Sequence, residues 1–179
     1  MRTKTHATQT GSADCRITAR RFATCHEVNT SRIVQAVRAA LGNRPCRSLA
    51  VVIVDDARIA QLHRQFMADP TPTDVLTFDL RDDLINGPIE GEVVVSVETA
   101  RRQARRYRTE PDQELLRYAI HGTLHLVGFD DRTPSERRRM RREEDRILVQ
   151  LAGKGPGTGK RMRPRRARPR HPQETVGRA

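Results

Sequence analysis

The sequence is poor in aromatic residues and in long apolar runs. It has four phenylalanines, two tyrosines and no tryptophan among 179 residues, which leaves little room for the stacking platforms of sequence-reading RNA modules. No apolar run approaches the roughly 18 residues of a transmembrane helix, and no signal-peptide core follows the N-terminus. We therefore expect a cytoplasmic protein with no membrane partner. The length suits one domain with a sizeable core better than two.

Cysteine is also scarce. The three cysteines, Cys15, Cys25 and Cys46, form no Cys-x-x-Cys pair, and their odd number leaves at least one unpaired. We expect no disulfide framework and interpret all three as small apolar residues or exposed thiols.

Acidic residues are outnumbered by basic ones, and the excess is concentrated at the C-terminus. The net charge is +12, from 34 basic and 22 acidic residues, and residues 153–179 contain nine lysines and arginines against one glutamate. This Gly-, Pro- and Arg-rich segment is predicted to be a disordered basic tail. Its positive charge would favour binding to RNA or another polyanion through counterion release. Alternatively, the tail only increases solubility. Residues 1–13 are predicted to be a disordered leader, so the folded domain is expected at 14–152.

One stretch carries most of the candidate chemistry. Residues 121–131 read His-Gly-Thr-Leu-His-Leu-Val-Gly-Phe-Asp-Asp. A helix places His121 and His125 one turn apart on the same face, where both can bind one cation. Gly128 can end that helix with a positive φ, and the resulting turn brings Asp131 back as a third ligand. The pattern predicts a metal centre of these three residues; the alternative is a buried helix with two incidental histidines and a polar turn.

The same ligand spacing occurs in zinc peptidases of the metzincin type. Those enzymes place a glutamate general base directly after the first histidine, and here Gly122 occupies that position. The chain could therefore form the metal site, but it lacks the general base that the usual peptidase mechanism requires. A bound cation would instead lower the pKa of a water from about 15.7 toward about 7 and polarise a phosphoryl or carbonyl oxygen. The sequence does not identify the general acid or base.

Residues 121–130 also resemble a family signature. They are similar at every position to His-Gly-x-Leu-His-Leu-x-Gly-[Tyr/Phe]-Asp, which characterises the YbeY family of single-strand endoribonucleases, also called rRNA maturation factors. At the next position the family usually has a third histidine, which Asp131 replaces in this chain. A carboxylate can still bind zinc, but it shifts the preference slightly toward harder cations. Residues 72–78 and 91–96 are similar to two family strand motifs and come in family order. The resemblance therefore covers about residues 45–151.

This resemblance implies a function. The chain would be a metal-dependent endoribonuclease that cleaves single-stranded RNA, chiefly in maturation of small-subunit ribosomal RNA, and that contributes to ribosome quality control. Its partners would be single-stranded ribosomal RNA and the small subunit, and His121, His125 and Asp131 would hold one Zn²⁺ or another divalent cation. The family usually has an arginine facing the RNA phosphates where this chain has Met67. Arg64, one helical turn earlier, either reaches the same space or is simply solvated.

Two alternatives follow from these departures. A metal-binding, ribosome-associated factor with little catalytic activity is credible because the family arginine is absent. A zinc peptidase is the weaker alternative because of Gly122.

The rest of the sequence predicts an α+β fold with a small mixed four-stranded sheet, about five helices and the metal motif on a central helix. Strands are expected at 16–22, 48–54, 74–79 and 91–97. Helices are expected at 30–41, 55–67, 98–108, 109–127 and 133–151, with caps at Thr30 or Ser31, at Asp55 or Asp56, at Thr109 and at Thr133. The third of these helices carries Arg101, Arg102 and Arg105, which form either a solvated face or a contact surface for the RNA backbone.

Overall fold

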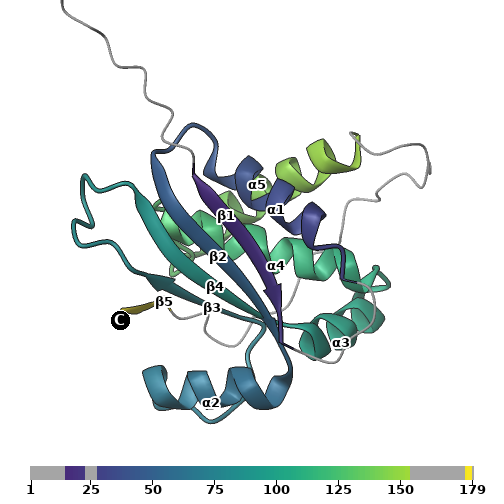
Figure 1. Cartoon of the computed structure of the whole chain (residues 1–179). Coiled ribbons are helices and arrows are strands. Elements are labelled where there is room, and N and C mark those ends of the chain that lie inside the picture. The colour runs from purple at the N-terminus through teal and green to yellow at the C-terminus, as the bar shows by residue number, and fades with distance from the viewer. Residues whose placement is uncertain (1–14, 23–27, 154–175, 179) are drawn as a thin grey trace, which may run out of the picture.

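The apolar, β-branched segments of the chain form a mixed sheet (Figure 1). The computed structural model describes residues 15–22, 28–153 and 176–178. The first four strands are β1 (Arg16–Arg21), β2 (Cys46–Val54), β3 (Val75–Asp79) and β4 (Ile89–Ser96). Their order is β1-β2-β4-β3; β1, β2 and β4 run parallel, and β3 is antiparallel to β4. The predicted mixed sheet of four strands is confirmed.

A fifth strand was not predicted. The short strand β5 (Val176–Arg178) pairs in parallel with β3 and so extends the sheet at that edge. It lies within the segment that we expected to be a disordered tail. The expected leader, and the rest of that tail beyond residue 153, lie outside the described residues.

Five helices complete the described part of the chain. They are α1 (Thr30–Leu41), α2 (Asp56–Met67), α3 (Val97–Tyr107), α4 (Pro111–Leu126) and α5 (Pro134–Ala152). Asp55 caps α2 and Thr133 opens α5 with a full capping box, as predicted. Two predicted caps are wrong. Asn29 caps α1, and Glu110 precedes α4 because Pro111 takes its first position while the Thr109 hydroxyl donates to the Glu114 carboxylate.

The helices cover both faces of the sheet because neighbouring strand residues point to opposite sides. On β4, Val93 and Val95 belong to the larger core with α1, α4 and α5, whereas Val94 packs with Leu76 and with Ile59 of α2. Figure 1 shows α2 on one side of the sheet and α4 on the other. Helix α4 is almost entirely buried between β3 and β4 and the helices α1, α3 and α5. The metal motif therefore lies on a central helix, as expected.

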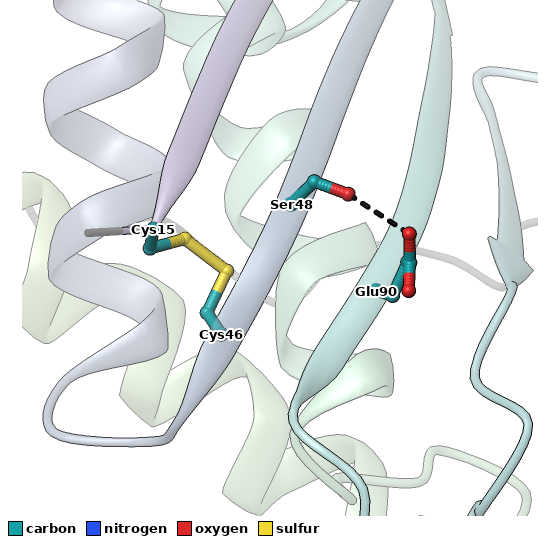
Figure 2. Close-up of a disulfide and its surroundings, with 4 residues drawn as sticks. All are labelled: Cys15, Cys46, Ser48 and Glu90. Carbon is teal, nitrogen blue, oxygen red and sulfur yellow. Dashed lines mark hydrogen bonds between the residues drawn. A yellow bond between two sulfur atoms is a disulfide. The ribbon is translucent and has the colours of Figure 1, made fainter. Parts of the chain in front are cut away.

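A disulfide joins the beginnings of two neighbouring strands. Cys15 precedes β1, Cys46 is the first residue of β2, and their sulfur atoms are bonded (Figure 2). This finding corrects, for Cys15 and Cys46, the expectation that the cysteines are small apolar residues or exposed thiols, whereas Cys25 lies outside the described residues. The two are 31 residues apart in the chain, and the parallel pairing that places Arg16 opposite Ser48 brings them together. Cysteine spacing alone does not reveal such a long-range register.

None of the helices in the described part of the chain combines the length and apolar character that a bilayer crossing requires.

Candidate metal centre

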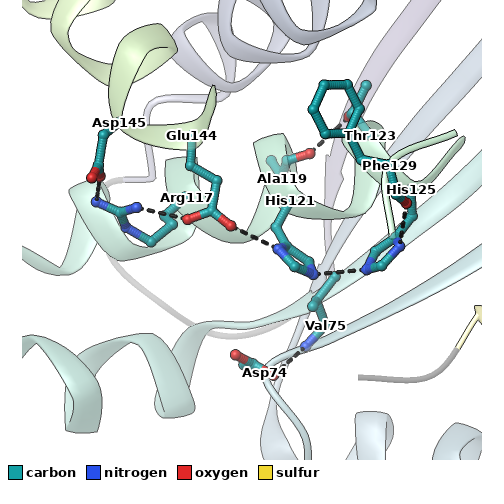
Figure 3. Close-up of polar contacts among 10 residues, drawn as sticks. All are labelled: Asp74, Val75, Arg117, Ala119, His121, Thr123, His125, Phe129, Glu144 and Asp145. Atoms are coloured by element: carbon teal, nitrogen blue, oxygen red, sulfur yellow. Dashed lines mark hydrogen bonds and ion pairs between the residues drawn. The ribbon is translucent and has the colours of Figure 1, made fainter. Parts of the chain in front are cut away.

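The three predicted ligands meet at one place. One potential ligand atom from each of His121, His125 and Asp131 lies within 4.8 Å of the other two. His121 is 6% exposed, and the other two residues are half-buried. Figure 3 shows both imidazole rings projecting from α4 toward each other. A buried two-histidine, one-carboxylate group of this kind is a donor set that suits zinc and other divalent transition-metal cations.

Gly122 positions the helix that carries both histidines. A Cβ atom at this residue would lie 2.6 Å from Cγ1 of Val93 and 2.7 Å from Oγ1 of Thr77. Only glycine therefore lets α4 pack this closely on β3 and β4. Residue 122 faces the sheet and not the ligand cluster, so this position has no room for the glutamate base of a metzincin-type peptidase.

The turn after α4 fixes the orientation of the second histidine. Gly128 has φ of +93°, its N–H donates to the carbonyl of His125, and the N–H of Phe129 donates to the carbonyl of Leu124. These two bonds make a Schellman motif, in which glycine supplies the left-handed residue. The motif directs the Phe129 carbonyl back toward the helix, where it accepts a hydrogen bond of 3.1 Å from Nδ1 of His125. The guanidinium of Arg139 packs 4.8 Å above the Phe129 ring.

A buried carboxylate fixes the orientation of the first histidine. Nδ1 of His121 donates to Glu144 of α5 over 2.7 Å, and Glu144 is only 7% exposed. The other oxygen of Glu144 accepts from Arg117 over 2.7 Å, and Arg117 also donates to Asp145 over 2.7 Å (Figure 3). Burial alone would raise the pKa of Glu144, but its hydrogen bond and electrostatic interaction with His121, and next those with Arg117, outweigh burial and lower that pKa to about 2. Glu144 is therefore an ionised acceptor.

The two Nδ1 contacts determine which nitrogen atoms face the cluster. A carboxylate and a carbonyl can only accept, so both Nδ1 atoms carry protons, and the Nε2 atoms of His121 and His125 face each other at 2.9 Å. Burial, and next the neighbouring His121, lower the pKa of His125 to about 4. His125 is thus neutral near pH 7, with a lone pair on Nε2. The space between these atoms suits one electrophile, either a shared proton or a metal cation, and the third donor, Asp131, favours the cation.

The predicted RNA-contacting arginines lie on other elements. Arg64 is exposed on α2, across the sheet from α4. Arg102 forms an ion pair with Asp56 and donates to Thr99 over 2.6 Å, so its guanidinium is already bound to protein groups. Arg101 and Arg105 are exposed and line a shallow surface cavity of about 470 Å³, together with Ala104, Arg108, Thr109, Glu110 and Pro111.

Sequence reasoning missed the groups that hold the histidines. One signal was present for Glu144, since it lies four residues after Met140 and four before Leu148, on the apolar face of α5. A carboxylate on a buried helical face needs a partner. Arg117 had no comparable signal, because it stands in a helix that is buried on nearly every side.

The chain is similar to proteins of one known family. The family described as "Endoribonuclease YbeY" matches residues 15–152. The chain is 43% identical over 109 residues to endoribonuclease YbeY of Anaeromyxobacter sp. (strain Fw109-5), covering 61% of this chain and 56% of that protein. The protein of the same name from Beutenbergia cavernae is 36% identical over 139 residues, with 73% and 93% covered.

The fold is similar to a solved structure as well. The solution structure of the Thermotoga maritima protein TM1509 matches with a TM-score of 0.52 and 25% identity, over 78% of this chain and 89% of that one. The chain spans little more than half of the Anaeromyxobacter relative, at 56% of its length, but nearly all of the Beutenbergia relative. Because the family match extends across the whole described core, this chain belongs to the YbeY endoribonuclease family.

Proposed function

We propose that the chain is a cytoplasmic, metal-dependent endoribonuclease that cleaves single-stranded RNA. Its proposed setting is maturation of small-subunit ribosomal RNA and ribosome quality control, with that RNA and the small subunit as partners. Membership of the YbeY family supports the nuclease activity. The observation that carries the metal dependence is the facing pair of Nε2 atoms, 2.9 Å apart, with both Nδ1 atoms bound to acceptors. Asp131 completes the donor set.

The residues of the site would have separate roles. His121, His125 and Asp131 would hold one divalent cation, with Zn²⁺ as the first choice for this donor set. When bound, that cation supplies Lewis-acid activation of water and of a phosphoryl oxygen. Glu144 and the Phe129 carbonyl keep the two imidazoles in one tautomer and one orientation. The burial of His121 limits the access of bulk water to the ligands, which strengthens their electrostatic interactions.

Exposed arginines on α3 would bind the RNA backbone. Arg101, Arg105 and Arg108 share the shallow cavity beside the first turn of α4. Guanidinium groups form bidentate hydrogen bonds with phosphates and need no base contacts. Arg102 was predicted together with Arg101 and Arg105, but its ion pair with Asp56 makes it the weakest candidate of these three. Arg64 stays a proposal that rests on its exposed position alone.

The decisive experiment compares wild type with His121→Ala in cleavage of a single-stranded RNA oligonucleotide. Each protein is assayed after zinc loading and after chelation, and bound metal is quantified in the same samples. We expect cleavage only by zinc-loaded wild type. Cleavage that persists in metal-free His121→Ala protein would refute the proposal. Bound zinc without cleavage would instead favour a ribosome-associated binding factor, for which Met67 in place of the family arginine is the motivating observation.

A second assay tests the arginine surface. The double variant Arg101→Ala/Arg105→Ala removes two phosphate contacts and should reduce the slope of log K against log salt by about 1.4 for single-stranded RNA. The matched control is Arg32→Ala/Arg38→Ala, which removes the same charge from exposed positions on α1. Equal effects of the two double variants on RNA affinity would show that only net charge matters.

A further inference from the structure

The strongest feature outside the ligand set is an ionic chain, buried at Arg117 and Glu144, that ends on a candidate ligand. Arg117 of α4 donates to both Asp145 and Glu144 of α5, and Glu144 also contacts Nδ1 of His121 (Figure 3). Each of these three contacts measures 2.7 Å, and Arg117 and Glu144 are 5% and 7% exposed. We propose that Glu144 is a positioning residue that orients His121 for the metal and that Arg117 holds Glu144 in place. This inference rests on the proposed metal centre.

The chemistry of the contact favours metal binding. An ionised carboxylate accepts the Nδ1 proton, so the lone pair of His121 is left on Nε2, the atom that faces His125. The same hydrogen bond limits rotation of the ring about its Cβ–Cγ bond. It also makes Nε2 a stronger donor to a cation, because negative charge at the far side of the ring raises ligand basicity.

Arg117 keeps this carboxylate available. An isolated buried carboxylate would be strongly destabilised and would tend to take up a proton, which would abolish its ability to accept from His121. The Arg117 guanidinium stays charged in proteins and donates one N–H to Glu144 and another to Asp145. Glu144 is thus held from two sides, by a cation on one oxygen and by the imidazole on the other. The arrangement is complete without any metal, so the ligand is already oriented when the metal arrives.

A purely structural role is the competing explanation. The Arg117–Glu144 pair also joins α4 to α5, and a buried pair of this kind affects stability whatever His121 does. The two roles differ in one respect. A structural pair alters the free energy of unfolding of the metal-free protein, whereas a positioning residue also alters metal affinity in protein that is still folded.

The test uses Glu144→Gln with Glu143→Gln as its matched control. Both changes neutralise a glutamate on α5, but Glu143 pairs with exposed Arg146 and not with the metal site. Zinc affinity is measured by competition with a chelator, and Co²⁺ absorption spectra report the ligand geometry. Circular dichroism and urea unfolding of the metal-free proteins establish that they are folded. We expect Glu144→Gln to weaken zinc binding about 10–100-fold and to change the cobalt spectrum, with both unchanged in Glu143→Gln.

The outcomes separate this inference from the proposed function. If wild type and His121→Ala bind zinc equally, or neither binds it, the metal centre itself is wrong. If wild type binds zinc through His121 and Glu144→Gln binds it equally well, only the positioning role fails. Should Glu144→Gln not fold, long-range ¹H–¹⁵N spectra of the histidine rings in zinc-loaded wild type decide the question. A proton on Nδ1 of His121 supports the inference, and an unprotonated Nδ1 overturns it.

Discussion

Gly122→Ala should destabilise the protein although alanine is the better helix former. In an exposed helix interior, this change would add about 1 kcal/mol to the free energy of unfolding. Here the new Cβ would lie 2.6 Å from Cγ1 of Val93 and 2.7 Å from Oγ1 of Thr77. Val93 is completely buried in the core, at 0% exposure, so it cannot move aside freely. Overpacking of this kind costs about 1–3 kcal/mol.

We expect the free energy of unfolding to fall by about 1–2 kcal/mol, because the new Cβ overlaps two neighbouring side chains and the overpacking outweighs the gain in helix propensity. Urea unfolding of the metal-free protein measures it, and the melting temperature should fall by about 2–4 °C for each kcal/mol. Zinc affinity should fall too, because moving α4 off the sheet displaces both histidines.

A double variant tests the steric explanation directly. Val93→Ala removes the closest of the overlapping atoms, so Gly122→Ala should cost less in that background than in wild type, with a coupling energy of at least about 1 kcal/mol. If Gly122→Ala is instead as stable as wild type or more stable, α4 does not pack on the sheet as described. A glutamate side chain would then also fit at position 122.

Three further predictions address other parts of the fold. Gly128→Ala and Gly42→Ala both place alanine at a positive φ with no atom near the new Cβ, so each should lower the free energy of unfolding in urea by about 1–3 kcal/mol. Only Gly128→Ala should weaken zinc binding. Thiol titration of the denatured protein without reductant should find one thiol, and three thiols would contradict the Cys15–Cys46 bond. Reduction of that bond should lower the free energy of unfolding by about 3–4 kcal/mol, given the length of the loop that it closes. Because burial and the adjacent histidine lower the pKa of His125 to about 4, the unfolded chain takes up a proton near pH 6.5 that the metal-free folded protein resists. Stability should therefore fall between about pH 6.5 and 4, by no more than about 3 kcal/mol, and a flat profile over that window would refute the shift.

Local sequence signals identified the candidate ligands because the relevant geometry is local. The four-residue spacing of His121 and His125 fixes their common face, and Gly128 marks the end of α4, so the helix and its turn together bring Asp131 back. Each step depends on residues within a few positions of one another. The other strands and the helices followed from periodicity for the same reason, but β5 was not predicted, the cap of α1 was predicted one or two residues too late and that of α4 one residue too early.

Contacts between distant segments were not accessible in this way. Glu144 reaches His121 across 23 positions, and Cys15 meets Cys46 across 31. Both contacts depend on how elements pack, on α5 against α4 and on the register of β1 with β2. The interpretation of Cys15 and Cys46 as apolar residues or thiols was wrong, because cysteine number and spacing say nothing about which two strands lie side by side.

The departure at Asp131 gains meaning once the charge of the three candidate ligands is counted. Asp131 contributes −1, and both histidines are taken as neutral when they ligate metal, so the ligand set carries −1 before a cation binds. A divalent cation changes this to +1. Under the proposed function, that remaining charge matches a single phosphodiester anion, whereas a third neutral histidine would leave +2. Under the same proposal, the carboxylate would make the loaded site a weaker Lewis acid, but one whose ligand charge a single RNA phosphate would balance better than an uncharged peptide.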